Sequence, residues 1–149
     1  MRSGWLLLAL VAALHLGTAR ADMASANLLV SAYVAPRTSV EAVGAPDTIK
    51  LTTVDLALGY KDVSAMYRVN SNDARGYMLQ FSARAGLTRA IEVRGLGAPV
   101  DFGVFGAEVP RFGRPLHADE LELQYRLHLT ADALPGEYAM PVTVAATPL

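Results

Sequence analysis

Residues 121–129 alternate strictly between apolar and polar side chains, and this pattern constrains the fold more than any other feature of the sequence. A period of two predicts a β-strand with one buried and one solvated face. After a turn at 132–136, a second apolar series continues with the same period, so we expect two strands that form a terminal hairpin and the spine of the domain. The two series are Leu121, Leu123, Tyr125, Leu127 and Leu129, and then Tyr138, Met140, Val142, Val144 and Ala146.

Shorter stretches repeat the alternation along the rest of the chain. Residues 63–69 and 77–83 flank the turn-forming segment Ser71–Gly76, which predicts a β-hairpin. Further strands are predicted around 23–35, 40–43, 49–54, 91–93 and 100–104, and residues 106–120, rich in glycine and proline, are predicted to be irregular surface chain. No segment has a sustained helical period. The predicted fold is therefore all-β, an immunoglobulin-like antiparallel β-sandwich of about 7 to 9 strands.

The N-terminus has the three parts of a secretory signal peptide. Arg2 is followed by the apolar run Trp5–Leu16 and by Ala19-Arg20-Ala21, a typical cleavage site. The apolar run is shorter than the roughly 20 residues that cross a bilayer. We therefore expect a signal peptide over residues 1–21, a single domain over 22–149, no transmembrane anchor after cleavage, and export to the periplasm, the cell surface or the medium.

Charge and cysteine content exclude several classes of function. Removing Arg2 and Arg20 from the 13 basic residues leaves 11 against 14 acidic ones, a formal net charge of −3 for the mature chain. The basic residues are scattered and form no stripe, so nucleic acid is not expected as a partner. The chain has no cysteine. Disulfides, thiolate metal sites and a cysteine nucleophile are thereby excluded.

The remaining chemistry-bearing residues predict no active site. His117 lies close to Asp119 and Glu120, and His128 shares the outer face of one predicted strand with Glu122, but no two histidines have the spacing of metal ligands. No nucleophile motif accompanies either histidine. The segment 70–73 resembles the start of a calcium loop but lacks the acidic residue near position twelve. We expect a protein that is not an enzyme and has no catalytic residue, cofactor or metal.

One segment could instead serve as a binding loop. Arg111 and Arg114 flank Phe112 within the predicted irregular region, and an exposed aromatic between two cations suits an acidic or carbohydrate partner. The alternative is that Phe112 packs against the end of the domain.

The two ends of the mature chain carry a resemblance to a known class of proteins. The segment Leu134–Tyr138 is similar to the tyrosine corner of immunoglobulin-like domains, with Gly136 and Tyr138 as its key residues. Followed by an alternating run, it also resembles fimbrial subunits of the chaperone-usher class and the related spore coat protein U-like domains. Those families usually carry a disulfide, whereas this chain has no cysteine.

The resemblance implies a mode of assembly. In those families the last strand of the sandwich is supplied by a periplasmic chaperone and then by the N-terminal strand of the next subunit. Here the candidate donor residues are Leu28, Val30, Ala32 and Val34. The expected function is a structural or adhesive subunit of a surface fibre or coat, with other subunits and a chaperone as partners. The alternative is a self-complete, monomeric binding module for a carbohydrate, peptide or envelope component.

Overall fold

The computed structural model describes residues 30–113 and 118–149 of a chain that divides into two compact units, 1–33 and 34–149. Of the first unit only residues 30–33 are described. They have no regular secondary structure, and Val30 and Tyr33 are exposed. The predicted signal peptide lies outside the described residues. Within the described ranges, no helix has the length and apolar character needed to span a bilayer.

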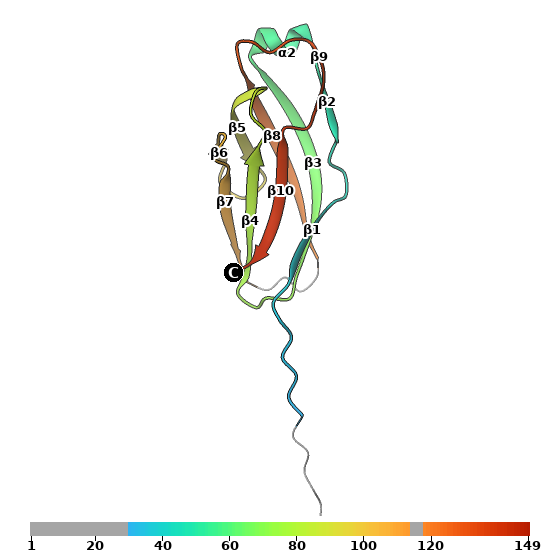
Figure 1. The fold of residues 1–149 in the computed structure, drawn as a ribbon, viewed down its shortest axis with the longest axis vertical. Helices are drawn as coiled ribbons and strands as arrows, with labels where there is room; N and C mark the ends of the chain where they lie inside the picture. The colour runs from blue at the N-terminus through green and yellow to red at the C-terminus, as the bar shows by residue number, and fades with distance from the viewer. Residues whose placement is uncertain (1–29, 114–117) are drawn as a thin grey trace, which may run out of the picture. The chain divides into compact units, whose positions relative to one another are not determined.

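The described part of the second unit consists of ten β-strands and one short helix, so the prediction of an all-β fold is confirmed (Figure 1). In chain order the elements are β1 (Thr38–Ala42), β2 (Thr48–Leu51), α2 (Thr53–Leu58), β3 (Tyr60–Ser71), β4 (Gly76–Ala83), β5 (Thr88–Arg94), β6 (Val100–Phe102), β7 (Ala107–Phe112), β8 (Asp119–Leu129), β9 (Gly136–Ala139) and β10 (Val142–Pro148).

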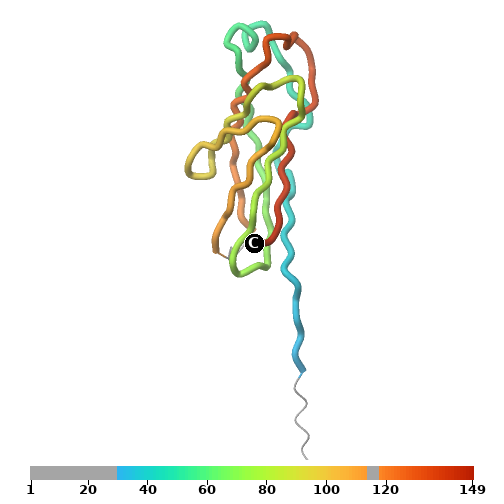
Figure 2. Tube along the Cα trace, turned by 60° about the vertical axis from the view of Figure 1, so that its left-hand side comes forward, coloured from blue at the N-terminus to red at the C-terminus, as the bar shows by residue number. Residues whose placement is uncertain are grey.

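The strands form three antiparallel sheets. The largest has the order β1-β3-β8-β5-β6, the second has the order β10-β4-β7, and β2 pairs with β9 in a two-stranded sheet. Buried side chains from the first two sheets belong to one hydrophobic cluster, which includes Leu123 and Tyr125 from β8 and Leu79 and Phe81 from β4. The tube in Figure 2 shows the strands of these sheets running alongside one another. The core therefore lies between the five-stranded and three-stranded sheets.

Both predicted hairpins are wrong, although the strands themselves form. β3 belongs to the five-stranded sheet and β4 to the three-stranded one, so the segment 72–75 carries the chain from one sheet to the other. Likewise β8 pairs with β3 and β5, while β10 pairs with β4. Alternation reports which face of a strand is buried and contains no information about its neighbour. Turn residues favour reversal of the chain but do not require that the flanking strands pair.

The second terminal strand is interrupted, which the alternation alone did not predict. β9 pairs with β2, and β10 begins after Met140 and Pro141 and pairs with β4. Proline has no N–H to donate to a ladder. The backbone instead makes contacts outside the ladders at this point, since Met140 N donates to Asp47 O at 2.8 Å and Arg84 N donates to Pro141 O at 2.8 Å.

Residues 107–112, predicted to be irregular, form β7 and pair with β4. Pro110 is tolerated because β7 is an edge strand, where one side of the backbone has no partner to lose. Val104, predicted in a strand, lies instead in the turn after β6 and is exposed.

Residues 53–58 form a helix where the sequence predicted the end of a strand at Val54. Thr52 and Asp55 make a reciprocal capping box, with Thr52 N donating to the Asp55 carboxylate at 2.8 Å. Gly59 ends the helix with a φ of 77°. The helix is too short for a hydrophobic period, so only its caps could have predicted it.

Candidate functional site: the edge of β10 and the adjoining groove

Two edge strands lie next to each other at one side of the molecule. β10 pairs only with β4, and β1 pairs only with β3. Residues of the two strands lie near each other, but within residues 30–113 and 118–149 no backbone ladder joins them. One edge of β10 therefore has backbone N–H and C=O groups without a strand partner, which is the usual template for addition of a strand.

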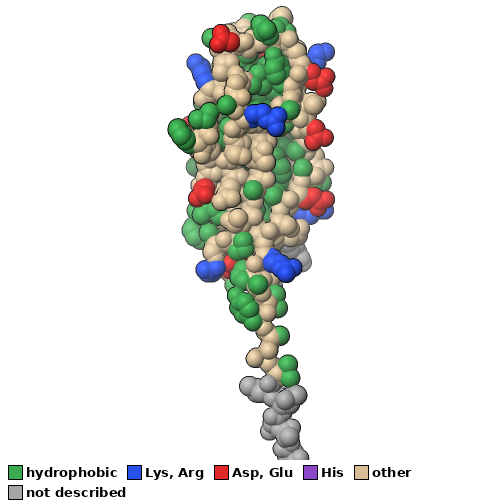
Figure 3. Space-filling model, viewed as in Figure 1, with side chains coloured by type: hydrophobic (Ala, Val, Ile, Leu, Met, Phe, Trp, Pro, Cys, Tyr) green, Lys and Arg blue, Asp and Glu red, His purple; other side chains and the backbone are tan. Residues whose placement is uncertain are grey.

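A groove of about 390 Å³ lies beside this edge. Its lining mixes apolar side chains with the polar residues Asp47, Arg84 and Thr143, and it comes from β1, β3 and the chain on both sides of Pro141. Tyr67, which is buried in the core, forms part of the lining together with Val40, Ala42, Ala45, Met140, Val142 and Val144. Hydrophobic side chains are visible between the strands on the face that carries β10 (Figure 3). The core is thus only partly covered at this position.

The burial of β10 decreases along the strand. Val142 is buried, whereas Val144 and Ala146, which point to the same side, are only half-buried. In a complete sheet the inner residues of such a strand would be covered by the neighbouring strand as well as by the opposite sheet. The half-buried residues show that this side of the core has room for further apolar side chains.

The predicted tyrosine corner adjoins this region. Tyr138 Oη donates a hydrogen bond to Leu134 O at 2.9 Å, so the ring folds back over the loop between β8 and β9. Gly136 lies beneath the ring, at 3.6 Å from a ring carbon for a Cβ built on it. The corner fixes the path of β9 and hence the start of β10.

The predicted donor residues form no strand where the structure describes them. Leu28 lies outside the described residues, and the predicted strand over 23–35 is absent in its described part, since residues 30–37 form no strand. Val30, Ala32 and Val34 are all exposed. An amphipathic strand forms only when its edges are paired, and Pro36 withholds one donor at its end.

Of the predicted binding loop, Arg111 and Phe112 are part of β7. Arg111 pairs across the ladder with Tyr77, and Arg114 lies outside the described residues. Phe112 remains exposed, at 82%. The guanidinium of Arg111 is directed to Asp119, at 3.8 Å, so it serves a contact within the domain.

Tyr77, Asp119 and Arg111 form a cluster that ties β4 and β7 to β8. The Tyr77 hydroxyl donates to the Asp119 carboxylate. Burial and then the neighbouring carboxylate raise the pKa of Tyr77 well above its ordinary value, so the phenol stays neutral and acts as a hydrogen-bond donor. The cluster has the properties of a structural link between sheets.

The outer face of the five-stranded sheet carries paired charges. The Arg126 guanidinium donates to both carboxylate oxygens of Asp62, at 2.8 and 2.9 Å, and lies 4.3 Å from the centre of the Tyr60 ring. His128 is half-buried on the same strand, and His117 lies outside the described residues. Within the described ranges no group of three His, Cys, Asp or Glu side chains is arranged to hold a metal ion.

Sequence reasoning missed the groove, although one signal pointed to it. Pro141 stands inside an alternating apolar series, where a proline indicates an edge or an interruption of a strand.

Comparison of the chain with protein-family models, with curated proteins and with solved structures finds no match.

Proposed function

We propose that this chain is a non-enzymatic, exported structural or adhesive subunit of a bacterial-type surface fibre or coat, and that subunits assemble by strand complementation. The observation that carries the proposal is an edge of β10 that no described strand pairs with, together with a groove beside it whose lining includes several apolar side chains. A strand added there would satisfy backbone groups along β10 and cover Val144 and Ala146.

The order of the strands supports an immunoglobulin-like sandwich that lacks its last strand. In such sandwiches one sheet has the order A-B-E-D and the other contains C, F and G. Here β1-β3-β8-β5 corresponds to the first order, and β4 and β10 correspond to C and F. No described strand takes the position of G beside β10. β7 departs from the pattern, because it lies beside β4 but follows β5 and β6 in the chain.

The donor would be the segment containing Leu28, Val30, Ala32 and Val34 of another copy, with a periplasmic chaperone occupying the groove before assembly. Alternation places these four side chains on one face of an extended strand. Burying each one contributes of the order of 1 to 3 kcal/mol for the larger side chains. The predicted signal peptide over residues 1–21 provides the export that this function requires.

The test is the size of the mature chain, residues 22–149, in solution. We expect the wild-type chain to form polymers on size-exclusion chromatography with light scattering. Placing charges on the donor face, with Val30→Asp and Val34→Asp, should abolish the polymers. The matched control carries Ser31→Asp and Tyr33→Asp on the opposite face of the same segment and should polymerise like the wild type.

An added peptide spanning residues 24–34 should bind to the double Val→Asp variant and raise its thermal midpoint, by the amount expected for a ligand that binds only the folded state. A wild-type chain that remains a monomer with one sharp unfolding transition, unaffected by the peptide, would contradict the proposal. That result would favour the self-complete binding module.

A further inference from the structure

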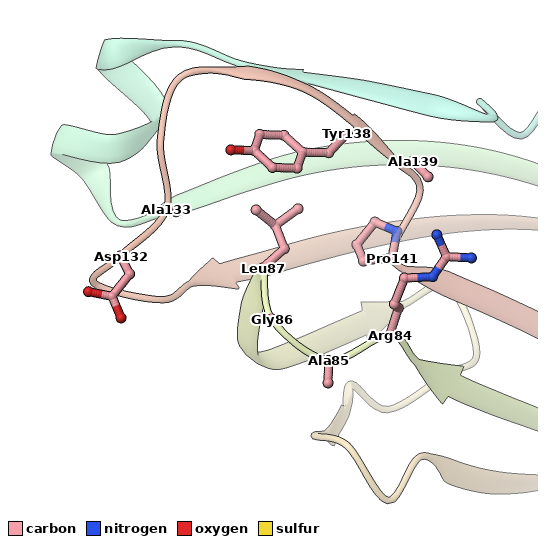
Figure 4. A pocket seen from close by; sticks show the side chains of 9 residues that line it. All are labelled: Arg84, Ala85, Gly86, Leu87, Asp132, Ala133, Tyr138, Ala139 and Pro141. Carbon is pink, nitrogen blue, oxygen red and sulfur yellow. The ribbon is translucent and has the colours of Figure 1, made fainter.

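The depression beside β10 extends beyond the groove described above. Arg84 and Ala139 line the groove and also line a second pocket of about 320 Å³, so the two volumes adjoin each other. Figure 4 shows this second pocket, with Pro141, the residue before β10, among its lining. Two adjoining volumes suit an extended segment of chain. Residues 24–34 would span about 35 Å when extended, which is longer than the seven-residue strand β10.

The chain's own residues 24–34 compete with those of another copy, because they precede β1 directly and β1 borders the groove. Arg37 O accepts a hydrogen bond from Asn72 N at 3.1 Å, on the side of β3. Backbone groups alternate in direction along a strand, so those of Thr38, Val40 and Ala42 are directed to the other edge of β1. Val40 and Ala42 also line the groove. A reversal of the chain just before β1 would therefore bring its own segment to this edge.

The length of the reversing loop decides which face of the segment would point to the core. Val40 packs against the core, and side chains directly opposite each other lie on the same face of a sheet. The shortest loop that turns the apolar face inward has three residues, 35–37. It would pair Val34 with Thr38, Ala32 with Val40, and Val30 with Ala42. A two-residue turn at 36–37 would shift the pairing by one residue and turn Ser31 and Tyr33 inward instead.

The sequence of residues 35–37 opposes the three-residue loop. Such a loop usually consists of a type I turn followed by a residue in the left-handed conformation. Pro36 would occupy the second central position of that turn, where proline is disfavoured because it restricts Ala35 to extended conformations. Arg37 would have to adopt the left-handed conformation that favours glycine. Closure of the chain's own groove with the apolar face inward is thus disfavoured locally.

The side chain of Asn72 holds the same three residues on the side of β3. Its Oδ1 accepts a hydrogen bond from Arg37 N at 2.6 Å, and its Nδ2 donates one to Ala35 O at 3.1 Å. The two bonds bracket Pro36, which has no N–H of its own. In an extended chain the carbonyl of one residue and the N–H two residues later point to the same side. The amide of Asn72 therefore fixes an extended path that continues the line of β1.

The loop that carries Asn72 is itself braced. Asp73 is buried, and its carboxylate accepts hydrogen bonds from Arg75 N at 2.9 Å and from the Arg75 guanidinium at 2.8 Å. Gly113 N donates to Arg75 O at 3.0 Å, which joins the loop to the end of β7. The segment 70–73, which resembles the start of a calcium loop in sequence, thus makes contacts within the chain. A braced loop loses little entropy when it holds residues 35–37.

We propose that Asn72, together with Pro36, prevents residues 24–34 from closing the groove of their own chain and so leaves this segment for a second copy. The inference rests on the strand complementation proposed above, and it names the residues that decide between a polymer and a self-complete monomer. Both arrangements would bury the same apolar side chains at the same edge. The conformation of residues 35–37 therefore sets the balance between them.

Crosslinking distinguishes a groove filled by its own chain from one filled by another copy. The mature chain, which has no native cysteine, carries Ala32→Cys on the donor face and Ala42→Cys beside the groove. A short bismaleimide should join the two positions in either arrangement. Denaturing electrophoresis separates linked monomers from linked dimers and larger species. Mass spectrometry of a mixture of isotope-labelled and unlabelled chains identifies links between copies.

The variants change the loop and the clamp separately. With the native loop, we expect links almost entirely between copies. Pro36→Asp with Arg37→Gly supplies residue types that the three-residue loop favours. In that background Asn72→Ala should raise the ratio of links within a chain to links between copies by about tenfold, as expected for the loss of two hydrogen bonds. Asn72→Asp, which keeps only the acceptor, should change the ratio in the same direction.

The matched control is Asn70→Ala, which removes an exposed asparagine of β3 outside the clamp and should leave the ratio unchanged. Adding Val30→Asp and Val34→Asp should remove both kinds of link, because charged side chains cannot enter the groove. Links that persist there would come from outside the groove and would contradict both proposals. Circular dichroism checks that each variant is folded.

The outcomes separate the clamp from strand complementation. Equal ratios with Asn72→Ala and Asn70→Ala, with links between copies still formed, would overturn the role of Asn72 alone. Links within a chain that appear only when Asn72 is replaced, with none between copies in the wild type, would support the clamp and refute the fibre. A wild type linked mainly within one chain, or no link in any variant, would overturn both.

Discussion

β8 and β10 carry the same alternation of apolar and polar residues, yet only β8 is enclosed. β8 lies between β3 and β5, and its five inner residues from Leu121 to Leu129 are at most 5% exposed. Among the described strands β10 has one neighbour, and Val144 and Ala146 remain half-buried. The difference separates two roles for the same pattern. A strand with two neighbours supplies stability, whereas a strand with one neighbour supplies a surface that can bind a further strand.

The largest expected effect comes from shortening one inward-facing side chain on each of the two strands to alanine. Leu123→Ala removes a side chain that is fully buried and should lower the free energy of unfolding by about 2 to 5 kcal/mol. Val144→Ala removes less volume from a half-covered position and should cost no more than about 1 kcal/mol. Urea denaturation in the non-polymerising Val30→Asp, Val34→Asp background measures both. Equal losses of unfolding free energy in the two variants would show that the core beside β10 is as closed as the core beside β8. The contrast drawn between the two strands would then be wrong.

A smaller effect is expected from the ion pair on the outer face of β8. The hydrogen bonds from Arg126 hold the pKa of Asp62 below its ordinary value of 3.8. Because the folded-state pKa is the lower one, the stabilisation is present above pH 3.8 and is lost as the pH falls below it. The Asp62 side chain is 58% exposed, so the pair should contribute only about 0.2 to 1 kcal/mol.

Thermal unfolding at pH 7, 5 and 3 measures this contribution. The wild type should lose more stability between pH 5 and pH 3 than the Asp62→Asn variant, which has no carboxylate to protonate. A matched substitution at an acid that makes no ion pair with a described residue, Glu122→Gln on the outer face of β8, should leave the pH dependence of the wild type intact. Identical profiles of stability against pH for all three chains would mean that the ion pair on the outer face of β8 contributes nothing to the stability of the domain.

The smallest effect is expected at the histidine of β8. His128 lies on the outer side of the strand, opposite Tyr60, and no catalytic or metal-binding task is assigned to it. His128→Gln should change the free energy of unfolding by at most about 0.5 kcal/mol. Calorimetry with and without added zinc tests this expectation. A large destabilisation, or zinc-dependent stability that disappears in the variant, would show that the outer face of β8 carries a site.

The candidate site shows where prediction from sequence failed. Alternation correctly located β3, β4, β8 and β10, but it assigned β8 to pair with β10 and β3 to pair with β4. The groove lies beside β10 because β10 pairs with β4 and β3 pairs with β8, and not as predicted. Had β10 paired with β8, its edge and its inner face would have belonged to the five-stranded sheet. Pairing between strands depends on loops, on prolines such as Pro141 and on the total volume of the core, none of which a local period measures.

The sequence by itself determined the all-β class and the buried face of the strongest strands, because side chains alternate across a strand whatever its neighbours are. It also contained the caps of α2, in Thr52, Asp55 and Gly59, as local hydrogen-bonding chemistry. Only the tertiary structure decided which strands pair, that β7 is an edge strand despite Pro110, and that β10 has one free edge. The reason is physical: the period of a strand is set by its own backbone, whereas its neighbours are set by the packing of the whole chain.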